Sequence, residues 1–90
     1  MEKLLVARTT EVKSLAGAIS NIIKQGHEVR LQAVGAGAVN QAVKAIATAG
    51  TYLMPYGMEI AAQPAFAIAE LGGEEKTAIT IKVRVIKELQ

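Results

Sequence analysis

The organisation of the chain is decided by residues 29–47, which read VRLQAVGAGAVNQAVKAIA. At the start of this stretch, Val29, Leu31 and Ala33 alternate with polar residues, and a period of two predicts a strand with one buried face. A glycine-rich turn at residues 35–37 comes next. Apolar residues then recur every three or four positions, which predicts an amphipathic helix. Its apolar stripe is predicted to be Val39, Ala42, Val43, Ile46 and Ala47.

The N-terminal side of this unit predicts another strand and another helix. Residues 3–7 are a short apolar stretch of strand-forming character, followed by Arg8-Thr9-Thr10. A threonine hydroxyl of this segment is expected to cap a helix of about four turns, with Glu11 in the first turn. Gly26 is expected to end that helix in a left-handed conformation. The apolar stripe of this helix is Val12, Leu15, Ala16, Ile19, Ile22 and Ile23.

The C-terminal side predicts two long strands joined by a hairpin. Gly50 is expected to loosen or end the second helix. A strand then runs over residues 58–68, and Pro64 places it at a sheet edge because proline has no N–H to donate. Gly72-Gly73 is typical of a tight turn, and a last strand over about residues 75–86 alternates apolar and polar residues.

These elements predict an α/β chain of the α+β two-layer class, in the order β-α-β-α-β-β. Right-handed crossovers would place both helices on one face of a four-stranded mixed sheet, with a long hairpin formed by the last two strands. Residues 1–90 are expected to form a single domain. The other sheet face would be polar and would carry a second basic strip, Arg30, Lys82 and Arg84, diluted by Glu28 and Thr80, with Gln32 beside them.

Composition narrows the class of protein. Hydrophobic residues make up 51% of the 90 residues, which excludes a disordered chain, and aromatic residues only 3%, so the core is built from small and β-branched side chains. A thin core of this kind favours pairing with a second copy. Cysteine is absent, and no apolar run suits a signal peptide or a membrane span. We therefore expect a cytoplasmic homodimer away from the membrane.

No arrangement of residues predicts an enzyme, a metal site or a cofactor. His27 is the sole histidine and follows the glycine that ends the first helix, where a solvated turn residue is expected. Glu74 and Glu75 have no third ligand at a suitable spacing, and a charged hairpin tip explains them. Ser14 and Ser20 have no histidine near them in sequence.

A binding surface is predicted where the two helices begin. The topology brings both helix N-termini to the same end of the sheet, and unpaired N–H groups there favour anions. The predicted nucleic-acid-binding residues are Arg8, Thr9, Thr10, Lys13, Gly35, Gly37, Asn40, Gln41 and Lys44. The glycines have two interpretations: cradling a phosphate, or allowing a sharp turn and close helix packing.

The sequence resembles a known family over almost its whole length. Residues 32–45, QAVGAGAVNQAVKA, resemble the signature of the stage V sporulation protein S family. Residues 14–19 (SLAGAI), 63–66 (QPAF) and 73–79 (GEEKTAI) resemble other parts of that family. The family in turn resembles the Alba superfamily of small chromatin and RNA-binding proteins, which share this order of elements and commonly dimerise.

The resemblance implies a nucleic-acid-binding regulator of bacterial sporulation or development. Carried over by position, the contacts with DNA or RNA would come from residues 8–13, 35–44 and the hairpin tip at 71–76. Alba proteins have a basic-glycine-basic tripeptide where this chain has Gly35-Ala36-Gly37, and the hairpin tip here is acidic, so weaker binding is expected. The alternative is a protein-interaction or small-anion regulator that holds a ligand such as a nucleotide in the glycine turn.

Overall fold

A computed structural model describes residues 2–89, and its elements follow the predicted β-α-β-α-β-β order. Met1 and Gln90, the ends of the expected single domain, lie outside the described residues. A short 3-10 helix, η1, precedes the third strand. The bounds are β1 Glu2–Val6, α1 Val12–Lys24, β2 Val29–Ala33, α2 Ala36–Leu53, η1 Met54–Tyr56, β3 Met58–Leu71 and β4 Glu74–Glu88.

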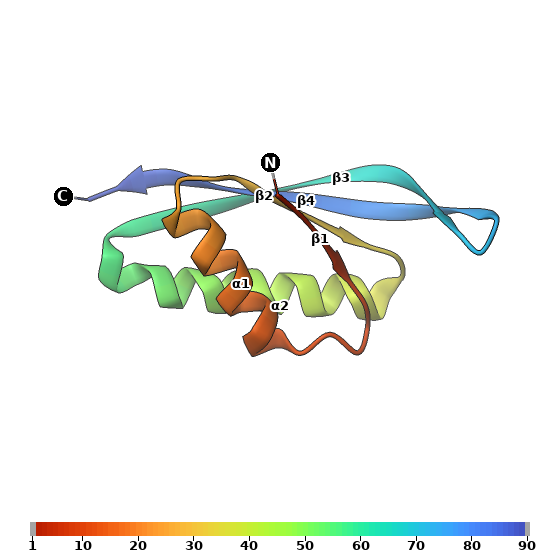
Figure 1. Ribbon diagram of the computed structural model, residues 1–90, viewed down its shortest axis with the longest axis horizontal. Helices are drawn as coiled ribbons and strands as arrows, with labels where there is room; N and C mark the ends of the chain where they lie inside the picture. The colour runs from red at the N-terminus through yellow and green to blue at the C-terminus, as the bar shows by residue number, and fades with distance from the viewer. Residues whose placement is uncertain (1, 90) are drawn as a thin grey trace.

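The four strands form one mixed sheet in the order β1-β2-β4-β3. β1 and β2 are parallel, whereas β4 pairs antiparallel with β2 on one side and β3 on the other. Both helices cover the same face of this sheet (Figure 1). β3 lies at the edge, which confirms the position predicted from Pro64. The predicted two-layer α/β architecture is therefore correct.

The hairpin of β3 and β4 gives the molecule an elongated shape. Its overall dimensions are 47 × 21 × 17 Å, and the turn of the hairpin projects beyond the helices (Figure 1). Gly72 and Gly73 form that turn with φ of 59° and 81°, values that favour glycine. The strands extend to Leu71 and from Glu74, so both are longer than the alternation of residue types predicted.

The packed face of α2 matches the predicted one only in part: Ala42 is buried and Val39 and Ile46 are partly buried against the core. The buried residues are Ala38, Ala42, Ala45, Ala49 and Leu53. Val43 is 53% exposed and Ala47 is also exposed, although both were predicted to be in the core. Because the helix lies close to α1 and to the sheet, only methyl-sized side chains fit between them over most of its length. The larger aliphatic residues are displaced to the flank of the helix.

The end of α2 also differs from the prediction. Gly50 was expected to loosen or end the helix, but the helix continues through it to Leu53. The side chain of Leu53 is fully buried, and burial of a leucine contributes about 1.5–3 kcal/mol. A glycine inside a helix costs only about 1 kcal/mol, so tertiary packing outweighs the local preference. Within residues 2–89, no helix combines the length and the hydropathy needed to cross a membrane.

The packing of α2 predicts different outcomes for two neighbouring alanines. Ala45→Leu should destabilise the fold by about 1–3 kcal/mol, because overfilling a packed site forces its neighbours to move. Ala47→Leu, at an exposed position of the same helix, has room for the larger side chain and should destabilise the fold less than Ala45→Leu does. Urea unfolding followed by circular dichroism measures both values. The reverse ranking would mean that the face predicted from hydrophobicity is the packed one.

Candidate nucleic-acid interface

The N-terminus of α2 is open to a ligand. Gly35 precedes the helix with φ of 89°, a value that favours glycine, and no side chain caps the first turn. The first hydrogen bond of the helix runs from Val39 N–H to the carbonyl oxygen of Gly35. The N–H groups of residues 36–38 come before it and have no carbonyl partner within the helix. The first turn holds no acidic residue. The positive end of the helix dipole is therefore not neutralised by a carboxylate of its own first turn.

Arg8, in the loop after β1, packs directly against this helix start. A Cβ atom added to Gly37 would lie 2.9 Å from the Cβ atom of Arg8, a separation that requires one of them to move. Gly35 thus allows a positive φ, and Gly37 allows the loop to approach closely. Both observations support the interpretation in which the glycines permit a sharp turn and close helix packing. Arg8, Gly35 and Gly37 also line a hollow of about 380 Å³ at this end of the sheet, together with residues of β1, β2 and the hairpin.

Thr10 holds the loop against the second turn of α2. Its hydroxyl accepts a hydrogen bond from Ala7 N–H at 2.8 Å, while its own N–H donates to the carbonyl oxygen of Ala7 at 3.0 Å. The side-chain amide of Gln41 donates to the carbonyl oxygen of Thr10 at 2.8 Å. The bond from Gln41 joins segments that are 31 residues apart in sequence. The predicted neighbourhood of the first loop and the second helix is present.

The start of α1 differs from the prediction. Glu11, and neither threonine, is the N-cap residue, so it precedes the first turn. Thr10 cannot cap the helix because its hydroxyl closes the turn with Ala7. The Glu11 carboxylate accepts a hydrogen bond from the hydroxyl of Ser14 at 2.6 Å. A negative charge already sits at this helix end, so α1 offers a poorer anion site than α2.

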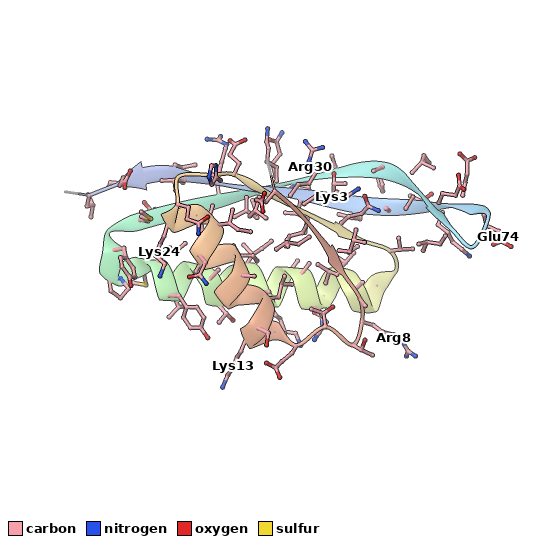
Figure 2. The ribbon with its side chains drawn as sticks, in the orientation of Figure 1. Lys3, Arg8, Lys13, Lys24, Arg30 and Glu74 are labelled. Atoms are coloured by element: carbon pink, nitrogen blue, oxygen red, sulfur yellow. The ribbon has the colours of Figure 1, made fainter. Side chains whose placement is uncertain are left out.

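The remaining predicted residues are divided between two places. Asn40 and Lys44 are exposed on α2, one and two turns beyond Gly37, and Thr9 is exposed in the loop. Lys13 projects from the start of α1, well apart from Arg8 (Figure 2). We call the assembled set the α2-start surface, and Lys13 lies outside it. Its members are Arg8, Thr9, Thr10, Gly35, Gly37, Asn40, Gln41 and Lys44.

The hairpin tip and His27 add no phosphate-binding group to this surface, although Leu71 of the tip lines the hollow beside Arg8. Glu70 stands opposite Glu75 in the strand register of the hairpin. Lys76 forms an ion pair with Glu74 at 3.5 Å. Three carboxylates therefore surround one cation, so the tip repels phosphate. His27 is exposed after Gly26, whose φ of 88° ends α1 as predicted. No cluster of three potential metal ligands occurs within residues 2–89.

Sequence reasoning missed two surfaces. The first is an apolar groove between α2 and the outer strands, which follows from the displaced face of the helix. The second is the full extent of the basic strip, because Lys3 of β1 stands opposite Arg30 in the sheet register. The alternation of Lys3 with Leu4 could have revealed it, since alternate residues of a strand share a face.

The comparison with known families agrees with the resemblance noted in the sequence. The family model described as stage V sporulation protein S matches residues 2–86. The match covers nearly the whole chain, so the protein belongs to the stage V sporulation protein S family. It is thus a small protein of a sporulation-related family, with a four-stranded mixed sheet and two helices.

The contact between Gly37 and Arg8 predicts a specific effect of an added methyl group. Gly37→Ala should displace the loop that holds Arg8, despite the better helix propensity of alanine. Backbone amide chemical shifts of residues 7–10 should move more than those of the other loops. Gly50→Ala is the matched control, since nothing lies within 4 Å of an added Cβ, and it should stabilise the fold by about 0.5–1 kcal/mol. Unmoved loop resonances in Gly37→Ala would contradict the contact.

Proposed function

We propose that this protein is a small, non-enzymatic nucleic-acid-binding regulator that acts as a homodimer in bacterial sporulation or development. The observation that carries the proposal is the uncapped N-terminus of α2 with Arg8 packed against its first turn. Backbone N–H groups and an exposed arginine whose Cβ contacts the same helix turn are suited to phosphate oxygens. The family membership supports the developmental role.

The charge distribution supports contact with the phosphate backbone more than recognition of bases. Arg8 and Lys44 are both exposed on the α2-start surface, and neither forms an ion pair within residues 2–89. Asn40 and Thr9 can donate to phosphate or sugar oxygens. Such contacts position a protein on nucleic acid but carry no sequence information. Binding should therefore be modest in strength and should weaken as salt increases.

A second candidate is a small-anion sensor, supported by the hollow beside Arg8. Its volume of about 380 Å³ suits a ligand of nucleotide size. The two candidates differ in a simple measurement. A sensor would be stabilised thermally by a free nucleotide and little affected by oligonucleotides, whereas a nucleic-acid-binding protein would respond in the opposite way.

Charge reversal on the α2-start surface tests the main proposal. Arg8→Glu with Lys44→Glu should abolish binding to a 20-base-pair duplex, because both cations would become repulsive to phosphate. Binding by the unmodified protein should fall steeply with salt in fluorescence anisotropy. Lys24→Glu with Lys87→Glu changes the net charge equally at positions outside that surface and should retain most of the affinity.

A melting temperature close to that of the unmodified protein would show that the Arg8→Glu, Lys44→Glu variant is folded, since both sites are exposed. Unchanged binding by that folded variant would contradict the proposed surface. Salt-independent binding would contradict a phosphate-directed mode.

The homodimer is supported by the apolar groove that α2 forms with the outer strands. The groove has a volume of about 390 Å³. Phe66 and Ile68, on the β3 face that carries Pro64, are 81% and 66% exposed. A continuous apolar face of this kind is unusual on a monomer, and a twofold axis would bury the same patch on both copies. The residues that line the groove are Val39, Val43, Ile46, Ala47, Ala62, Pro64, Ile79 and Ile81.

A single charge in the groove should dissociate the homodimer. Val43→Glu would bury a carboxylate at the interface without a partner, whereas in a single chain the same position is more than half exposed. Light scattering after size exclusion should therefore give the mass of one chain. Leu5→Glu, at a position that is 72% exposed on the other sheet face, should retain the dimer mass. A dimer mass for both variants would contradict this interface.

A further inference from the structure

The sheet face away from the helices carries a row of positive side chains. In the strand register Arg30 of β2 stands between Lys3 of β1 and Lys82 of β4. Neighbouring strands lie about 4.8 Å apart, so these three residues are adjacent. Arg84 lies two residues beyond Lys82 on the same face. Figure 2 shows Arg30 projecting from the sheet on the side away from both helices. We call these four residues the sheet-face row.

No ion pair in the described part of the chain involves this row. The one ion pair within residues 2–89 joins Lys76 to Glu74 at the hairpin tip. Around Lys3, Arg30 and Lys82 the other residues of the face are neutral, namely Leu5, Gln32, Ala61, Gln63, Ala65 and Thr80. Toward Arg84 the face also holds carboxylates, because Glu28 and Glu88 line the same hollow as Arg84. Glu28 precedes β2 and stands opposite Arg84 when the register is continued by one residue, so it offsets the charge at that end and leaves Lys3, Arg30 and Lys82 as the unopposed centre of the row. Like charges directly opposite on adjacent strands destabilise a sheet, so the free protein carries an unfavourable arrangement that a bound polyanion would relieve.

The neutral side chains between these cations indicate which anion fits. Gln32, Gln63 and Thr80 offer amide or hydroxyl groups that can donate to phosphate oxygens. The three aromatic residues of the chain, Tyr52, Tyr56 and Phe66, all lie elsewhere. Single-stranded nucleic acid is typically held by bases stacked on aromatic rings. Without such rings, this face suits a duplex, whose bases are stacked within and whose phosphates are outside.

The sheet-face row also borders the α2-start surface. Leu5 and Gln32 lie two residues beyond Lys3 and Arg30 on their strands, and both line the hollow beside Arg8 and Gly37. A ligand that contacts Arg8 can therefore extend onto the sheet without crossing a negative region. The acidic hairpin tip makes the opposite path unfavourable.

We propose that the sheet-face row binds the phosphate backbone of a nucleic-acid duplex, independently of sequence, as a second contact surface continuous with the α2-start surface. The inference rests on the nucleic-acid partner of the proposed function and adds a surface that the helix starts do not provide. Because the contact is to phosphate, random-sequence duplexes should bind as well as any chosen sequence.

The test compares two double variants that lower the net charge by the same amount. Arg30→Gln with Lys82→Gln removes two cations from the centre of the row. Lys24→Gln with Lys87→Gln removes two cations from other places and is the control. Affinity is measured by fluorescence anisotropy from 50 to 200 mM salt with random 20-base-pair DNA, the RNA duplex of the same sequence, and one single strand. Lys3→Gln with Arg84→Gln is a second variant of the row.

The row variants should lower the slope of log affinity against log salt by about two, because two phosphate contacts are lost. The control should change it by less than half as much. The Arg30→Gln, Lys82→Gln variant should also have a higher melting temperature at low salt than the unmodified protein, since the repulsion between these opposite cations is removed. Damage to the fold would lower that temperature instead. The DNA and RNA arms show which duplex the face prefers.

The binding results separate failure of the sheet-face row from failure of the α2-start surface. Slopes of both row variants equal to that of the control would overturn the inference, as would a larger loss with the single strand than with the duplexes. If Arg8→Glu with Lys44→Glu loses binding while the row variants retain it, the proposed function stands and the inference fails. If the row variants alone lose binding, the inference stands and the α2-start surface is wrong. An unmodified protein that binds neither duplex overturns both.

Discussion

The short distance at which α2 packs is the constraint on which the other surfaces depend. Ala38, Ala42, Ala45 and Ala49 are almost completely buried along it, and α1 contributes Ala16. Methyl side chains allow a helix to lie close to its neighbours, but each contact is small. The close approach brings the first turn of α2 against Arg8, where Gly37 has no Cβ to interfere. It also leaves no room in the layer for the larger aliphatic residues of α2, which become the wall of the apolar groove.

The distribution of charge over this protein says more about phosphate binding than the net charge does. The net charge is only +2. Half of the eight carboxylates lie at the hairpin tip and at the cap of α1, whereas Lys3, Arg30 and Lys82 stand side by side on the open sheet face. A weakly basic chain can thus present locally strong positive surfaces, since exposed charges interact mainly within about 10 Å at moderate salt.

The strands, the edge position and the hairpin were predictable because each has a local physical signature. Pro64 lacks a donor, Gly72-Gly73 permits a tight turn, and alternation in β4 marks its buried face. The packed face of α2 was not predictable in this way. Hydrophobicity selects Val43 over Ala45, and only the closeness of the neighbouring layer, a property of the assembled fold, reverses that order. Likewise the capping role of Thr10 was lost because Ala7, three residues earlier, uses its hydroxyl.

For the candidate site too, features with a signature in the sequence could be predicted, whereas those that depend on the assembled fold could not. The juxtaposition of the first loop with α2 follows from topology, because parallel strands end at the same sheet edge. The glycine turn could not be assigned from sequence, since a phosphate cradle and a close packing contact require the same residue type. The φ of Gly35 and the approach of Arg8 to Gly37 account for both glycines without a ligand. Those glycines leave exposed a helix start with no acidic residue in its first turn and an arginine packed against it, and these are the features that support binding.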